Sequence, residues 1–173
     1  NHNKGVDRLL KLSEYLINNN ISFFSIDIYG TARDNKKFYQ KLLNIKNERK
    51  LNNLNFMGHV FDVSNVFKNA FLLIRPSRDN DPWGRDVIEA VSSGLPVIAT
   101  GTYNKLVIHN KNGFLIDDFD STIITNYCLL LKDNPTKWEE FSRFSDQNLK
   151  PKFKGKKQGN EFKKILNSLN FNE

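Results

Sequence analysis

Apolar side chains recur along this chain in two alternating kinds of segment. In the longer kind they return every three or four positions, the spacing of amphipathic helices, over residues 5–18, 35–49, 62–69, 83–93, 120–132 and 135–147. The shorter kind consists of brief apolar runs, which predict strands at 23–29, 54–59, 71–74, 97–100 and 114–116. A last helix is expected near 159–169. The run at 71–74 is continuously apolar, as expected of a strand buried on both faces.

This order of elements predicts the fold class. Strands that alternate with helices indicate a parallel sheet with right-handed crossovers, hence an α/β, Rossmann-like sheet with helices on both faces. We expect residues 1–149 to form this domain and residues 150–173 to form a basic C-terminal segment with the final helix. The chain opens on a helix at Lys4-Gly5, whereas a doubly wound sheet begins with its central strand. We therefore expect the first strand to lie upstream of residue 1, in a longer parent protein.

Composition narrows the functional class. Hydrophobic residues make up 39% and charged residues 26% of the chain, which is ordinary for a globular protein of 173 residues. The sequence contains neither a basic-then-apolar leader nor an apolar run of the roughly 20 residues that span a bilayer. The single Cys128 excludes an internal disulfide, fits a cytoplasmic location, and falls in an apolar pattern typical of a core thiol.

The net charge of +7 is concentrated near the C-terminus. Residues 150–164 contain seven lysines against Glu161 alone. Such a segment could contact anionic lipid or nucleic acid, although a solvated segment is the plainer interpretation. Nucleic acid is disfavoured as a partner, because only Phe153 and Phe162 could stack on bases and the features of residues 75–100 would have no explanation.

Residues 75–100 carry the most informative pattern: a strand end, an acidic turn, a short helix stopped by Gly94 and Pro96, and another strand. Asp81 and Glu89 lie eight positions apart across the turn and the helix. In α/β proteins, polar ligands bind at the carboxyl ends of strands and against helix N-termini. A carboxylate there accepts hydrogen bonds from hydroxyls, so the expected ligand combines phosphates with many hydroxyls, as a nucleotide sugar does.

Other cofactor sites are not indicated. The sequence has no G-x-G-x-x-G after a strand and no P-loop, which disfavours a dinucleotide-dependent dehydrogenase. His2 and His109 have no partners at metal-ligand spacing, and catalysis by His59 is not expected. We therefore propose no metal site.

From Lys4-Gly5 to about Asp118, the order and spacing of motifs resemble the C-terminal, donor-binding domain of glycosyltransferase family 4, which has the GT-B fold. The matching pieces are Lys4-Gly5, Gly30, Phe56-Met57-Gly58, Pro76-Ser77, Asp81-Pro82-Trp83-Gly84-Arg85, Glu89-Ala90, Gly94-Leu95-Pro96-Val97-Ile98-Ala99 and Asn112-Gly113-Phe114-Leu115. Together they cover about two-thirds of the chain.

The resemblance implies roles for three charged residues. Glu89 matches the second glutamate of the family's pair and would accept hydrogen bonds from the donor's ribose. Asp81 stands where the family has the first glutamate, which contacts the donor sugar, although an Asp before Pro82 is also a good helix N-cap. Lys4 matches a lysine that neutralises the diphosphate as the leaving nucleotide gains charge. Glu89 and Lys4 could instead be ordinary surface charges.

Further residues are expected to bind the donor. The backbone amides of Trp83, Gly84 and Arg85 would face the sugar and phosphates at a helix N-terminus, where Gly84 allows close approach. Trp83 could wall the sugar pocket or pack in the core. The backbone of His59 and Val60 would read the base. Gly30, at another strand end, is a weaker candidate.

Taken together, the resemblance implies a nucleotide-sugar-binding domain of a retaining glycosyltransferase. It would transfer a hexose-type sugar from a UDP-, GDP- or ADP-sugar to a glycan or lipid-linked acceptor, as in polysaccharide biosynthesis, with no cofactor and no metal. Its partner would be the N-terminal GT-B domain of the same enzyme, with peripheral membrane contact through the lysine-rich segment. The Asp81 substitution keeps open an inactive, scaffold-like relative of these enzymes.

Overall fold

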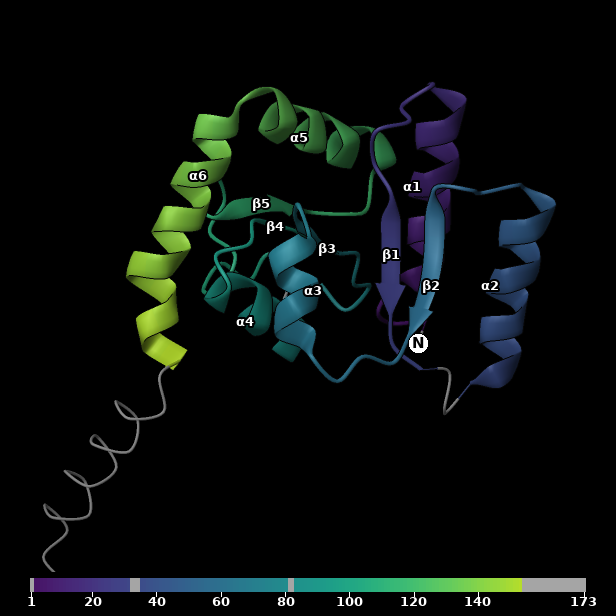
Figure 1. Cartoon of the computed structure of the whole chain (residues 1–173), viewed down its shortest axis with the longest axis horizontal. Helices are drawn as coiled ribbons and strands as arrows, with labels where there is room; N and C mark the ends of the chain where they lie inside the picture. Colours follow the sequence, from purple (N-terminus) through teal and green to yellow (C-terminus); the bar gives the residue numbers. More distant parts are fainter. Residues whose placement is uncertain (1, 32–34, 81–82, 154–173) are drawn as a thin grey trace, which may run out of the picture.

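The computed structural model of the chain describes residues 2–31, 35–80 and 83–153. Helices and strands alternate along it from α1 to β4, and β5, α5 and α6 follow (Figure 1). The helices are α1 (Val6–Asn18), α2 (Lys36–Glu48), α3 (Val63–Asn69), α4 (Arg85–Ser92), α5 (Ser121–Asp133) and α6 (Pro135–Phe144). The strands are β1 (Ile26–Tyr29), β2 (Leu54–Gly58), β3 (Leu73–Arg75), β4 (Val97–Thr100) and β5 (Gly113–Ile116).

All strand pairs formed by the described residues are parallel. β1 pairs with β2, with Ile26 opposite Leu54. β3, β4 and β5 form a second sheet in that order, with β4 in the centre. Every residue of β4 is buried, because both of its edges are paired and helices cover both of its faces. The α/β, parallel, Rossmann-like class expected from the sequence is confirmed.

Alternation along the strands divides the core into two layers. Ile98 of β4 points to the side covered by α1 and α5, where it packs with Leu12 and Ile124. Its neighbours Val97 and Ala99 point to the opposite side and pack against α4. The helices therefore cover both faces of the sheet, as the sequence pattern predicts.

Two predicted strands differ from the observed ones. The strand expected at 23–29 begins only at Ile26. Before it the rings of Phe23 and Phe24 meet edge-on, and Phe23 is 52% exposed. The strand expected at 71–74 is β3, which begins at Leu73. All three of its residues are only half-buried. The expectation of burial on both faces is wrong here, because one edge of β3 is open to a cavity.

The C-terminal part of the described chain is helical but irregular. α6 ends at Phe144, earlier than the expected 147, and continues as a π-helical turn over Ser145–Leu149 and a 3₁₀ turn over Lys150–Phe153. Leu149 is fully buried against the α4 layer, and Phe153 packs on the same layer. The final helix predicted near 159–169 lies outside the described residues. Among the helices that are described, none combines the length and apolar character needed to cross a membrane.

The start of α1 is fixed against the end of β3. Gly5 caps α1 with a φ of 69° in the left-handed region, which glycine adopts without strain. A Cβ atom on Gly5 would lie 1.8 Å from the carbonyl oxygen of Pro76, the residue that follows β3. Only a residue without a side chain allows this approach, so Gly5 determines where α1 begins relative to the sheet.

We expect Gly5→Ala to destabilise the protein by several kcal/mol. The left-handed backbone alone costs a non-glycine residue about 1–2 kcal/mol, and forced overpacking adds about 1–3 kcal/mol. Gly58→Ala is the matched control, because Gly58 has a φ of 75° but nothing within 4 Å of an added Cβ. Urea unfolding should show a larger loss of the free energy of unfolding for Gly5→Ala than for Gly58→Ala. Equal losses in the two variants would mean that the structure around Pro76 accommodates the added methyl group without an energetic cost.

Candidate functional site

The turn before α1 lies against the carboxyl end of β3. Gly5 touches Pro76 after β3, and the backbone N–H of Arg78 donates to the carbonyl of Asn3 at 2.8 Å. The ring of His2 packs edge-on against Phe38, in the first turn of α2, with 6.1 Å between centroids. The N-terminal turn therefore lies between the end of β3 and the start of α2.

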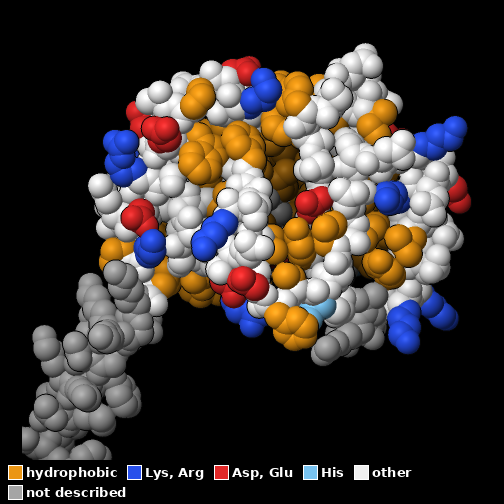
Figure 2. Space-filling model, in the orientation of Figure 1, with side chains coloured by type: hydrophobic (Ala, Val, Ile, Leu, Met, Phe, Trp, Pro, Cys, Tyr) orange, Lys and Arg blue, Asp and Glu red, His pale blue; other side chains and the backbone are white. Residues whose placement is uncertain are grey.

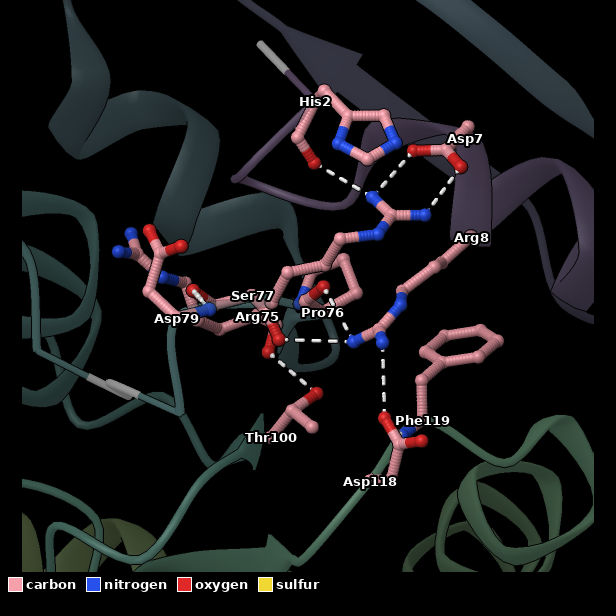
Figure 3. Close-up of polar contacts among 11 residues, drawn as sticks. His2, Asp7, Arg8, Arg75, Pro76, Ser77, Asp79, Thr100, Asp118 and Phe119 are labelled. Atoms are coloured by element: carbon pink, nitrogen blue, oxygen red, sulfur yellow. Dashed lines mark hydrogen bonds and ion pairs between the residues drawn. The ribbon is translucent and has the colours of Figure 1, made fainter.

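The side chain of Arg78 holds this turn in place through hydrogen bonds. Its Nη1 donates to the His2 carbonyl at 2.6 Å and to Oδ1 of Asp7 at 2.8 Å, and its Nη2 donates to Oδ2 of Asp7 at 2.5 Å (Figure 3). Both side chains are about a quarter exposed. Burial raises the pKa of Asp7, but the hydrogen bond and positive charge of Arg78 outweigh it, so the pKa lies below its usual value. The same hydrogen bond raises the pKa of Arg78.

Arg8 joins the first turn of α1 to two strand ends. Its Nη1 donates to the carbonyl of Ser77 at 2.9 Å, and its Nη2 donates to Oδ1 of Asp118 at 2.9 Å (Figure 3). The guanidinium also lies 5.6 Å from the centre of the Phe119 ring, a cation–π contact. Asp118 follows β5, so Arg8 fixes the position of α1 against both the β3 and the β5 ends of the sheet.

Arg75, the last residue of β3, organises the turn before α4. Its Nη1 contacts both carboxylate oxygens of Asp86 at 2.5 Å, and its Nη2 donates to the carbonyl of Trp83 at 2.8 Å. Its Nε is buried without a hydrogen-bond partner among the described residues. A Cβ on Gly84 would lie 2.3 Å from Oδ1 of Asp86 and 2.5 Å from Nη1 of Arg75. A side chain at residue 84 would therefore have to displace the ends of the Arg75 and Asp86 side chains.

The predicted residues of the α4 region lie at the helix start and on its surface. The Trp83 side chain is 46% exposed and meets the Tyr103 ring edge-on at 5.7 Å, so it is not a core tryptophan. Arg85 is 90% exposed, and its Nε lies 3.5 Å from Oε1 of Glu89, one turn further along α4. The Glu89 side chain is 37% exposed. Asp81 lies outside the described residues.

Lys4 is exposed beside the capping Gly5. The described residues offer its ammonium no ion pair. Since the N-terminal end of a helix carries partial positive charge, Lys4 lies beside the positive end of α1, whose first turn also contains Asp7. The start of α1 and the turn at Trp83–Gly84 lie near the same strand end, because Gly5 touches Pro76 and Gly84 lies against the guanidinium of Arg75.

The three residues predicted from the β1 and β2 ends lie further out. Gly30 follows β1, and its N–H donates to the Gly58 carbonyl at 2.7 Å. His59 is exposed and packs edge-on against Phe61 at 4.7 Å. Val60 lines the cavity between the two sheets. Gly30 and His59 thus follow the ends of β1 and β2, whereas Glu89 lies on α4.

Sequence reasoning missed the arginine network. Arg8, Arg75 and Arg78 hold the site together, yet none was singled out, because their partners are 11 to 110 positions away in the chain. The available signal was the cluster of charge at a strand end, Arg75-Pro76-Ser77-Arg78. Among the described ranges, no three His, Cys, Asp or Glu side chains gather in a way that could hold a metal ion.

A family model described as "Glycosyl transferases group 1" matches residues 1–148. The probable sucrose-phosphate synthase 5 of Oryza sativa subsp. japonica is 32% identical over 93 residues, which are 53% of this chain and 9% of that protein. Sucrose synthase isoform 1 of Daucus carota is 28% identical over 79 residues, which are 42% of this chain and 10% of that protein. The chain thus spans about a tenth of these curated relatives.

Solved structures match a larger share of the chain. Anabaena Alr3699/HepE in complex with UDP and glucose superposes with a TM-score of 0.83 at 22% identity, over 97% of this chain and 46% of that one. The C-terminal domain of a glycosyl transferase group 1 family protein (LpcC) from Francisella tularensis gives a TM-score of 0.72 at 18% identity, over 89% of this chain and 82% of that one. At these identities the likeness shows the fold, which is that of the C-terminal half of GT-B glycosyltransferases.

The Asp7–Arg78 ion pair predicts a specific pH dependence. Because the folded-state pKa of Asp7 lies below the unfolded value of about 3.9, its contribution to stability is complete above that pH and is lost as pH falls through the folded pKa. Asp7→Asn should therefore cost about 1–2 kcal/mol at pH 7 and much less near pH 2. Urea unfolding across this range measures the difference.

Arg78→Gln is the partner control for this experiment. Without the guanidinium, Asp7→Asn should lower the free energy of unfolding by less. The difference in this free energy that Asp7→Asn causes should also depend less on pH. A pH-independent difference in the original background would contradict the assignment of the shift to Arg78.

Proposed function

Because this chain belongs to the group 1 glycosyl transferase family, we propose that it is the nucleotide-sugar-binding domain of a retaining enzyme of glycosyltransferase family 4. The enzyme would transfer a hexose-type sugar to a glycan or lipid-linked acceptor held by an N-terminal GT-B domain. One observation supports this most directly: the start of α1, with Lys4, and the turn before α4, with Gly84, both contact the end of β3. That places a cationic helix start beside a helix whose next turn carries Glu89.

In this proposal Lys4 binds the diphosphate. The ammonium is exposed, the described residues leave it without an ion pair, and the free N–H groups of α1 add partial positive charge beside it. A cation fixed at this point stabilises the charge that the nucleotide gains as the glycosidic bond breaks. Arg8 and Arg78 act indirectly: their hydrogen bonds to strand-end carbonyls and to Asp7 hold α1 in place.

Glu89 is proposed to bind the ribose. Its carboxylate is half-buried on α4 and lies 3.5 Å from the Nε of Arg85, a distance at which the pair is weak and easily exchanged for hydroxyl hydrogen bonds. An ionised carboxylate accepts hydrogen bonds from both ribose hydroxyls and repels phosphate. This favours the orientation in which the ribose faces Glu89 and the phosphates face away from it.

Trp83 and Tyr103 are proposed to wall the sugar. Their rings meet edge-on, and both are partly exposed at carboxyl ends of the sheet. An aromatic face packs well against the apolar C–H face of a hexose. The amides after Gly84 begin α4 and would face the sugar and phosphates, while the backbone of His59 and Val60 would contact the base.

The proposed chemistry needs no metal and no cofactor. Acceptor attack and nucleotide departure would occur on the same face of the sugar, and the leaving phosphate would help to deprotonate the acceptor. The donor is a UDP-sugar in the first instance, which is supported by Anabaena structures determined with UDP and with UDP-glucose. GDP- and ADP-sugars are the alternatives. Association of the lysine-rich segment with a membrane stays a prediction, since residues 154–173 lie outside the described chain.

A second candidate function rests on Asp81. An aspartate one methylene shorter than the family's glutamate could fail to reach the sugar, leaving an inactive scaffold. The two candidates differ in whether the chain binds a nucleotide.

We expect the chain to bind UDP saturably in calorimetric titration, more tightly than uridine. Lys4→Ala should weaken UDP binding about tenfold and leave uridine unchanged, because the lost interaction is with phosphate. Glu89→Gln should weaken both ligands by a similar factor, because both contain the ribose. GDP and ADP, titrated in parallel, identify the base.

Lys11→Ala and Glu140→Gln are the matched controls, since each removes an exposed charge of the same sign, Lys11 from the middle of α1 beyond its first turn and Glu140 from α6. Neither should change the affinity. A folded chain that binds none of the three nucleotides would overturn the donor-binding proposal and favour the scaffold.

We further expect the isolated chain to bind donor without transferring sugar. The acceptor and any helper base would be supplied by the N-terminal domain. Incubation with radiolabelled UDP-glucose and a lipid-linked or oligosaccharide acceptor should yield no labelled product. Sugar transfer by the 173-residue chain would show that the acceptor site lies within it.

A further inference from the structure

The charges of this domain are unevenly distributed, and α2 is where positive charge concentrates. Residues 36–50 contain six Lys or Arg side chains against Glu48 alone, whereas residues 1–35 and 51–149 together contain 13 Lys or Arg and 16 Asp or Glu. Figure 2 shows Lys and Arg side chains along the right-hand side of the molecule, where Figure 1 places α2. The helix therefore gives the folded domain a basic side of its own, separate from the lysine-rich segment after residue 149.

Three lysines of α2 lie outside its contact with the rest of the domain. Leu42 is the buried residue of the helix and packs in the core layer that α1 covers. Lys36, Lys37 and Lys41 are exposed to solvent. Among the described residues, no carboxylate lies within ion-pair distance of these three ammonium groups. Their charge is therefore not neutralised within the part of the chain that the structure describes.

These positions do not stabilise the helix itself. Lys36 and Lys37 lie in the first turn of α2, where the helix dipole favours acidic side chains, and this turn contains none. Lys37 and Lys41 are one turn apart, a spacing at which like charges repel each other. Glu48, the acidic residue of the helix, stands at its C-terminal end, where the dipole favours cations. The charges of the first two turns therefore oppose helix formation, and an external anionic surface would stabilise them.

A shallow depression of about 490 Å³ runs along the outward face of α2. Its lining combines ammonium groups with carboxamides and consists of Lys37, Gln40, Lys41, Asn44, Ile45 and Glu48. Ammonium and amide N–H groups are donors, and phosphate oxygens accept hydrogen bonds from them. Glu48 lies seven positions beyond Lys41, about 10 Å along the helix axis, so one end of the depression is cationic.

The side chains of α2 also distinguish between anionic partners. Lysine is a point charge suited to a diffuse anionic surface, whereas planar recognition of single phosphates or bases uses arginine, and Arg49 is already paired with Glu14 at 2.6 Å. Phe38 and Tyr39 turn inward, against the N-terminal turn and β2. Because α2 is described in full and exposes no large apolar side chain, it offers neither a ring for a nucleobase nor an anchor for a protein partner.

We propose that the outward face of α2 binds an anionic lipid membrane, with Lys36, Lys37 and Lys41 against the headgroup phosphates. Each lysine near an anionic bilayer strengthens association about fivefold, so three lysines strengthen it about a hundredfold, and Glu48 opposes them. Since these contacts are exposed, salt screens them. The proposal rests neither on the proposed function nor on residues 150–164, because all the residues that carry it lie in α2.

This contact would orient the domain on the membrane. α2 follows β1 and runs back antiparallel to it, so the helix begins at the edge where β1 and β2 end (Figure 1). Its first turn lies beside the N-terminal turn of the chain, because His2 packs against Phe38. A bilayer held by Lys36 and Lys37 would therefore lie next to the strand ends rather than at the opposite edge of the sheets.

The test compares the full chain with two triple variants of equal net charge. In the first, glutamine replaces the three exposed lysines of α2. In the matched control, glutamine replaces three exposed lysines outside α2, which are Lys68, Lys105 and Lys111. Co-sedimentation is measured with vesicles of phosphatidylglycerol and phosphatidylcholine and with vesicles of phosphatidylcholine alone. Residues 150–164 are the same in all three proteins, so differences between the proteins report on the replaced lysines.

The α2 variant should associate with the anionic vesicles at least about tenfold more weakly than the unaltered chain, and the control variant should stay within about threefold of it. Arginine at the same three positions of α2 keeps the charge and should preserve association. Equal weakening by both glutamine variants would overturn the proposal, because net charge alone would then explain the association. An unaltered chain with no preference for anionic vesicles would also overturn it, as would an α2 variant that loses binding to duplex DNA but not to vesicles.

Discussion

The contact between Gly5 and Pro76 is the constraint on which the arrangement of this domain depends. A helix cap in the left-handed region and a strand-end carbonyl occupy space that any side chain on residue 5 would fill. The Asp7–Arg78 ion pair and the hydrogen bonds of Arg8 then hold α1 in that position. Since α1 packs against both sheets, its placement also sets how the two sheets stand relative to each other.

The end of β3 also fixes the turn before α4. Its last residue, Arg75, pairs with Asp86 and holds the carbonyl of Trp83, so the turn before α4 is built on the strand itself. Gly84 lets this turn close over the ion pair. One strand end thus positions two helix starts, and the candidate residues Lys4 and Glu89 derive their places from it. Fixing a site on a strand and two helices makes its geometry more rigid than loops alone would allow.

Periodicity predicted the elements well, because each helix and strand is a local property of the sequence. It failed at Phe23 and at β3, where exposure depends on whether a neighbouring strand edge is filled. Motif order also placed Lys4 before the first helix and Glu89 within the helix after the acidic turn, as the structure has them. The charge cluster at the end of β3 could have drawn attention to the arginines, but their partners could not be predicted, because a salt bridge between residues 71 positions apart leaves no pairing signal in the local sequence. Asp81, the most informative substitution, lies outside the described chain.

The two tryptophans of the chain are placed very differently. Trp138 donates from its indole to the carbonyl of Phe71 at 2.7 Å and stacks on that ring, far along the chain from the candidate site. Trp83 is nearly half exposed beside α4. The protein therefore contains its own pair of optical reporters: one indole emits from the surface where a ligand would arrive, and the other emits from a packed position where it would not.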